Sequence, residues 1–181
     1  MTRVSSRARG VGGGPSGGFS LIELVIVVVI IGIIAAIAIP RMSRGSQGAA
    51  ENALAGDMAV WRSALDLYQT EHGGAYPKDN TTILAQLTQY TDGTGATATA
   101  KDTTHIYGPY MRAVPPLPVT DPSNAQSVPK GSTTIGACTA GGTAPATVTI
   151  GGYGWLYDGA GNLYPNTGTV TDASGKAYNQ Y

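Results

Sequence analysis

A single carboxylate, Glu23, lies near the start of an apolar run that extends from Leu21 to Ile39. As an α-helix these 19 residues would be about 28 Å long at ~1.5 Å per residue, close to the thickness of the hydrocarbon core of a membrane. An ionised carboxylate in lipid costs at least about 2.5 kcal/mol, so an acid inside such a helix indicates a function. The chemistry that it predicts is a charge pair with a cation.

An α-amino group would supply that cation if the chain were cut between Gly18 and Phe19. Within one helix the amine and the Glu23 carboxylate are awkwardly placed, because the first turn points the amine along the helix axis. Between neighbouring helices of a bundle the two charges can pair. Glu23 would then fix the register in which copies of this chain stack, as a buried polar residue fixes register in a coiled coil.

The residues before the apolar run fit such a cut. Residues 1–18 are basic, lack acidic residues and end in glycines. A secretory signal has its small-residue cleavage site after the hydrophobic region, whereas here the small residues precede it. Cleavage would leave the apolar run as an anchor, with the basic residues favouring a cytoplasmic N-terminus. The alternative is a cytoplasmic tail on an uncleaved signal anchor.

The run Gly18-Phe19-Ser20-Leu21-Ile22-Glu23-Leu24 resembles the prepilin peptidase site of type IV pilins and type II secretion pseudopilins. The resemblance implies cleavage after Gly18, N-methylation of Phe19, and pairing of Glu23 with a neighbour's terminal amine in a fibre. Pro40 falls where this family has a helix-kinking proline, and both it and Gly32 weaken a helix. The resemblance therefore implies that the segment from Gly32 to Pro40 can unwind in the fibre.

Composition narrows the choice within that family. The chain has 181 residues, enough for one modest domain and an anchor, and its 11 basic and 11 acidic side chains give no sign of nucleic-acid binding. Its one cysteine, Cys138, excludes an intrachain disulfide and a cysteine-only zinc site. Many type IV pilins close a C-terminal loop with a disulfide. The resemblance is therefore closest to the major pseudopilin, with a type IV pilin as the alternative.

A second apolar pattern predicts that the helix continues beyond the anchor. Apolar side chains recur at intervals of four and three residues along one helical face: Leu54, Met58, Trp61, Leu65 and Tyr68. Gly73, Gly74 and Pro77 should end the helix. We expect the apolar face to pack against a small domain that follows.

The remainder of the chain predicts a loop-rich domain with short elements. We expect a helix at 82–90, loops at 91–104 and 121–146, an extended proline-rich segment at 108–118, a strand at 147–150, and a hairpin of 153–157 and 162–164 around a turn at 158–161. Trp155 should pack on the apolar helical face. The polar tail, residues 167–181, should fray or form an edge strand.

These predictions define an α+β fold in which a long N-terminal helix, half membrane-inserted and half amphipathic, packs on a small C-terminal antiparallel sheet, as in pilins. The expected divisions are a leader at 1–18, an apolar assembly helix at 19–40, an amphipathic helix at 41–73 and a loop-rich domain at 74–181.

Asp158, Asn162 and Asp172 are candidate calcium ligands, because major pseudopilins often bind calcium between their last strands. Their spacing is not that of an EF-hand, and a hairpin turn requires the same residue types, so the turn is the favoured interpretation. We therefore assign no cofactor. His72 and His105 are the only histidines, and no spacing predicts a catalytic triad, so we do not expect an enzyme.

The sequence predicts a structural subunit of a helical pilus-like fibre. It would wait in the inner membrane as a single-pass protein with an extracytoplasmic C-terminal domain. Its partners would be copies of itself, other pilins or pseudopilins, a prepilin peptidase, an inner-membrane assembly platform and lipid, but no nucleic acid. Outside this class, the alternative is a monomeric membrane-anchored module whose loops at 91–104 and 121–146 bind a ligand.

Overall fold

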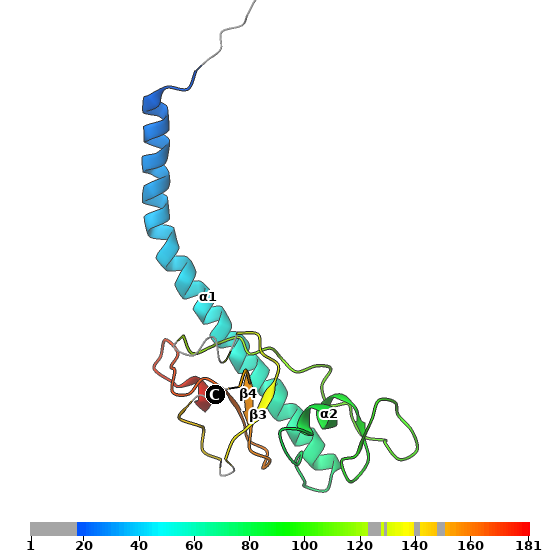
Figure 1. Cartoon of the computed structure of the whole chain (residues 1–181). Helices are drawn as coiled ribbons and strands as arrows, with labels where there is room; N and C mark the ends of the chain where they lie inside the picture. The colour runs from blue at the N-terminus through cyan, green and yellow to red at the C-terminus, as the bar shows by residue number, and fades with distance from the viewer. Residues whose placement is uncertain (1–17, 123–127, 129, 140–141, 148–150) are drawn as a thin grey trace, which may run out of the picture. The chain divides into compact units, whose positions relative to one another are not determined.

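The structure is a computed structural model. It describes residues 18–122, 128, 130–139, 142–147 and 151–181, with the backbone alone for residues 39–44. The chain divides into two compact units, residues 1–44 and 45–181, and each is described by itself. Helix α1 (Leu21–Glu71) contains residues of both units and is assigned as continuous helix through Pro40 (Figure 1).

The first unit contributes the apolar part of α1. Residues Leu21–Ala38 have a mean hydropathy of 3.2, and none of them is buried. By length and composition this segment can cross a membrane. Its apolar side chains point in every direction around the helix axis, as expected of a helix surrounded by lipid or by other apolar helices.

The second unit is built around the remaining part of α1. The five apolar residues expected on one helical face, from Leu54 to Tyr68, are all at most 3% exposed, which confirms the predicted pattern. Gly73 and Gly74 follow the helix with φ angles of 66° and 94°, a left-handed conformation that glycine adopts easily. The helix therefore ends where the sequence predicts.

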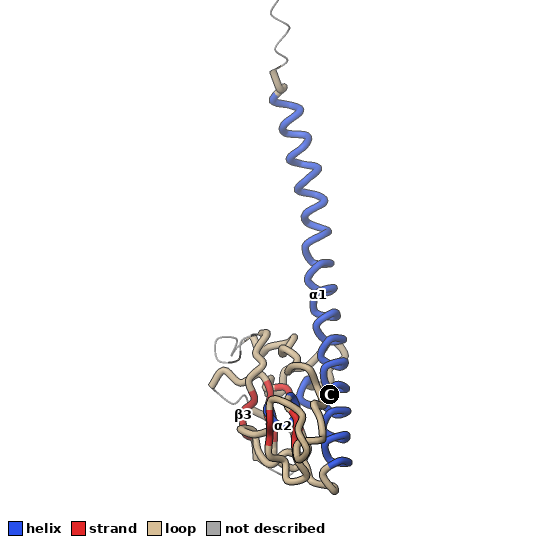
Figure 2. Tube along the Cα trace, turned by 90° about the vertical axis from the view of Figure 1, so that its right-hand side faces the viewer, coloured by secondary structure: helices blue, strands red, loops and turns tan. Residues whose placement is uncertain are grey.

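A three-stranded sheet packs against this part of α1 (Figure 2). Its strands are β3 (Ile135–Ala137), β4 (Trp155–Tyr157) and β5 (Leu163–Pro165), in the order β3-β4-β5. Strand β5 is antiparallel to β4, with Leu156 opposite Tyr164, and β3 is parallel to β4. The Trp155 ring contacts the Trp61 ring edge-on at a centroid distance of 5.9 Å, which confirms the predicted packing.

Shorter elements complete the unit. Helix α2 (Ile83–Thr88) lies within the expected 82–90 segment, and η1 (Tyr178–Gln180) is a 3-10 turn near the end of the chain. Strands β1 (Tyr90–Thr91) and β2 (Thr97–Ala98) form an antiparallel pair, the β1–β2 hairpin. The α+β class is confirmed, although the sheet is mixed because β3 runs parallel to β4.

Three local predictions were wrong. The expected loop at 91–104 contains Thr91 of β1 and the whole of β2, and the loop at 121–146 contains β3. The tail at 167–181 is not frayed, because Tyr178 is buried and its hydroxyl donates to Glu51 Oε1 at 3.1 Å. The strand expected at 147–150 lies outside the described residues except for Thr147, which is not in a strand.

Candidate functional site

The start of α1 brings together the residues that could be processed and paired. Glu23 lies in the first turn, and its Oε2 accepts a hydrogen bond from the backbone N–H of Ser20 at 3.2 Å. The N–H of Leu24 in turn donates to the carbonyl oxygen of Ser20 at 3.2 Å. Ser20 and Glu23 thus hold the positions of a capping box, in which a glutamate reaches back to the first free N–H of its helix. A carboxylate there is also favoured by the helix dipole.

This contact was missed in the sequence analysis, which considered only a partner on another chain. The Ser-x-x-Glu spacing of residues 20–23 was the available signal. The Glu23 carboxylate therefore already has a hydrogen-bond partner, the Ser20 N–H, within a single copy of the chain. Its pairing with a neighbouring amine stays a prediction.

The surroundings of this site are apolar and open. Phe19 is 83% exposed and Leu21 is 79% exposed. A Cβ placed at Gly32 would meet no atom of the described residues within 4 Å, so no close contact among them requires this glycine. Pro40 lies further along the same helix, and the unwinding of the 32–40 segment stays a prediction.

The comparison with protein families agrees with this geometry. Residues 15–39 match the family model described as the prokaryotic N-terminal methylation motif. The match supports a type IV pilin-like protein, and the apolar helical segment within the matched residues fits a membrane-anchored protein of that kind. It does not distinguish a pseudopilin from a pilin. Comparison with curated proteins and with solved structures found no match.

The candidate calcium ligands are engaged in turns. Asp158 Oδ1 accepts from the N–H groups of Ala160 and Asn162, and its Oδ2 accepts from the Asn162 amide at 2.7 Å. Asp172 Oδ1 accepts from the N–H groups of Ser174 and Lys176. The described residues hold no group of three or more His, Cys, Asp or Glu side chains that could bind a metal ion. These contacts support the turn interpretation.

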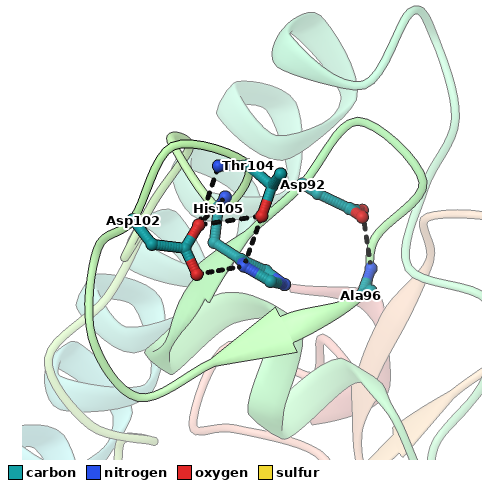
Figure 3. A network of polar contacts seen from close by, with 5 residues as sticks. All are labelled: Asp92, Ala96, Asp102, Thr104 and His105. Atoms are coloured by element: carbon teal, nitrogen blue, oxygen red, sulfur yellow. Dashed lines mark hydrogen bonds and ion pairs between the residues drawn. The ribbon is translucent and has the colours of Figure 1, made fainter.

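A polar network in the loop before Tyr107 was not predicted (Figure 3). Asp102 Oδ2 lies 2.9 Å from Nδ1 of His105, and Asp102 Oδ1 accepts from the N–H groups of Thr104 and His105 at 2.7 Å. These hydrogen bonds, that from the His105 N–H first, lower the pKa of Asp102 below its usual value. The sequence signal was an Asp-x-Thr spacing, which favours a turn closed by the aspartate side chain. The network holds the loop.

The described part of the second unit contains a hollow of about 470 Å³ beside α1. Trp61, Arg62 and Leu65 of α1 line it together with Tyr164 and the end of the tail. The described residues that line it include no His, Cys, Asp or Glu.

Proposed function

We propose that this chain is a structural subunit of a helical pilus-like fibre and, within that class, a type II secretion pseudopilin. The observation that carries the proposal is an apolar helix with no buried residue over Leu21–Ala38 and one carboxylate, Glu23, in its first turn. The methylation motif over residues 15–39 supports the same class. A type IV pilin of a surface pilus is the alternative within it.

The exposed apolar surface of α1 is suited to a subunit that moves from membrane lipid into a fibre, because both environments are apolar. Removing apolar area from water is worth about 25 cal/mol per Å², so an apolar environment around this helix is strongly favoured over water. Lipid provides that environment before assembly, and the corresponding helices of neighbouring copies provide it in a fibre. Because the helix is apolar on all sides, neither environment requires a change in its sequence pattern.

Glu23 supports an ordered rather than a random association. Cleavage after Gly18 would leave the Phe19 amine close to the carboxylate of Glu23 in sequence and, in a bundle, close to that of the next copy. A buried carboxylate without a cation is costly, so only the registers that pair the two charges would be favoured. The single cysteine, Cys138, supports a pseudopilin because it excludes an intrachain disulfide within this sequence.

The Glu23→Ala variant tests the proposal in a host that contains the prepilin peptidase and the assembly platform. We expect normal membrane insertion and a strong loss of fibres, measured by membrane fractionation and electron microscopy. The matched control is Glu71→Ala, which removes a glutamate from the last turn of the same helix and should leave fibres intact. Normal fibres from Glu23→Ala would contradict the proposed role of this carboxylate.

A deletion strain separates the two members of the class. If the chain is a pseudopilin, its deletion should stop export of proteins that use the type II pathway and leave surface pili unchanged. If it is a type IV pilin, the opposite result is expected. If residues 1–18 remain attached and no fibre forms, the membrane-anchored binding module becomes the better hypothesis.

A further inference from the structure

The imidazole of His72 is enclosed at the C-terminal end of α1. His72 directly follows the last residue of the helix and is 8% exposed. Its Nδ1 lies 2.9 Å from the carbonyl oxygen of Tyr68, and its Nε2 lies 2.9 Å from the carbonyl oxygen of Asp92. Asp92 follows strand β1, so the ring connects the helix end to the β1–β2 hairpin.

The number of donors on the ring decides whether both contacts are hydrogen bonds. A carbonyl oxygen only accepts, and a neutral imidazole carries one N–H. With the neutral ring, one nitrogen lone pair would face a carbonyl oxygen, and that contact would be lost. The protonated ring carries two N–H groups and satisfies both the Tyr68 and the Asp92 carbonyl.

The rings around His72 also favour a cation. The Tyr68 ring is stacked on the imidazole with a centroid distance of 3.8 Å and an interplanar angle of 5°. The Tyr107 and Tyr110 rings lie at 5.3 and 6.2 Å. Of these rings, that of Tyr68 is stacked face to face on the imidazole, and an aromatic face attracts a cation at this distance. The last carbonyls of a helix also carry the negative end of its dipole. Burial acts in the opposite direction, because it disfavours the charged ring.

We propose that His72 is a proton-dependent clamp that fastens the β1–β2 hairpin to the C-terminal end of α1. With two ring protons both contacts form, and with one proton either the Tyr68 or the Asp92 contact is lost, so in both tautomers the ring no longer joins the helix end to the hairpin. A contact that requires the protonated form stabilises the fold at lower pH and is lost as the pH rises through the titration of the ring. The hairpin should therefore be more protected at pH 6 than at pH 9.

Other titratable groups belong to the residues around the ring and are part of the test. The Glu71 carboxylate accepts a hydrogen bond at 2.7 Å from the hydroxyl of Tyr110, whose ring lies 6.2 Å from that of His72. The pKa of Asp92 is lowered, first by the hydrogen bond from the Thr94 hydroxyl and to a smaller extent by His105, so the Asp92 carboxylate stays ionised over this range. Burial raises the pKa values of Tyr68 and Tyr110, which keeps these phenols neutral.

Nitrogen NMR of the full-length chain in detergent micelles tests the proposal directly. The chain has two histidines, so the His105→Gln variant leaves one imidazole to observe. We expect both ring nitrogens of His72 to carry protons at pH 6. Loss of the second proton at higher pH should coincide with faster hydrogen exchange of the hairpin amides, after correction for the pH dependence of intrinsic exchange.

The His72→Gln variant provides the second measurement. Its amide supplies donors at one end only, so hairpin protection should be lower at pH 6 and should no longer change with the ionisation of residue 72. His105→Gln should retain the pH dependence of the parent chain. The proposal is wrong if His72 carries a single N–H at pH 6, or if hairpin protection in the parent chain does not follow its titration.

Discussion

Helix α1 contains two segments that differ in how much of their apolar surface is buried. In Leu21–Ala38 no residue is buried although nearly all are apolar. In residues 45–71 one helical face is apolar and buried, with Leu54, Trp61 and Leu65 at most 2% exposed, whereas Val60 and Leu67 lie off that face and are each 49% exposed. Helix formation alone therefore does not decide burial, which follows from the distribution of apolar residues around the axis.

The comparison indicates where each segment obtains its stability. Residues 45–71 belong to a unit with its own core, so substitutions there should change the unfolding of that unit. No residue of Leu21–Ala38 is buried, so substitutions there should change membrane insertion or assembly instead. The four predictions below test this division, beginning with the largest effect.

Trp61→Ala should strongly destabilise the second unit. Trp61 is 0% exposed and contacts Trp155, and truncation of a buried tryptophan costs about 3–5 kcal/mol. The free energy of unfolding can be measured by chemical denaturation in detergent, followed by tryptophan fluorescence of Trp155. Ile30→Ala, in the exposed apolar segment, is the control and should leave this transition unchanged. Equal losses in the two variants would remove the distinction between the segments.

Two glycine substitutions should have opposite signs. Gly159 has a φ of +74°, and a Cβ there would lie 2.7 Å from the carbonyl oxygen of Lys78, so Gly159→Ala should destabilise the unit; we expect about 1–3 kcal/mol. Gly56 lies in α1 with no atom within 4 Å of an added Cβ, so Gly56→Ala should stabilise the helix, by up to about 1 kcal/mol. Thermal unfolding measures both. A stabilising Gly159→Ala would show that the turn is not held against Lys78.

Tyr178→Phe should produce a smaller loss. The variant keeps the buried ring and removes the hydroxyl that donates to Glu51, an interaction worth about 0.5–1.5 kcal/mol. Limited proteolysis should then cleave the tail faster than in the parent chain. The same rate in both chains would mean that the ring alone holds the tail on the second unit.

Acid should weaken the second unit through its turns. Hydrogen bonds lower the pKa values of four exposed aspartates, led by the Thr81 hydroxyl for Asp79, the Thr94 hydroxyl for Asp92, the His105 N–H for Asp102 and the Tyr181 hydroxyl for Asp172. For Asp79 the pKa falls to about 2. A depressed pKa adds stability above the unfolded value of about 3.9, and this stability is lost as the pH falls towards the folded values.

The unfolding temperature should therefore be nearly constant from pH 7 to about pH 5 with respect to these groups and should fall below about pH 4. Each contribution is small because the carboxylates are exposed. Asp79→Asn should make the unfolding temperature depend less steeply on pH below pH 4. The same dependence in that variant would show that the pKa of Asp79 does not differ between the folded and the unfolded chain.

The sequence was sufficient for the parts of the fold that rest on periodicity. The two segments of α1, its end shortly before Gly73, and the hairpin around Asp158 follow from spacing and from turn residues within a few positions. Strand β3 could not be predicted in this way, because it has three residues and its parallel partner β4 begins at Trp155. Its central residue, Gly136, is a poor strand former, yet an added Cβ would lie 2.7 Å from the Tyr153 ring.

Part of the candidate site could be proposed from the sequence. Residue types and order point to Gly18, Phe19 and Glu23 because the motif is local, and their cleavage, methylation and pairing stay predictions. The contacts of His72 with Asp92 and of Tyr178 with Glu51 join residues that are far apart in sequence, and no periodicity signals them. The capping contact of Ser20 with Glu23 was local and could have been predicted.

The N-terminus of the chain isolated from its native membrane tests the central claim most directly. If the exposed apolar helix is an assembly element whose Glu23 pairs with a neighbouring amine, intact-mass and peptide mass spectrometry should find a chain that begins at a methylated Phe19. A native chain that retains residues 1–18 would lack that amine and would contradict the account.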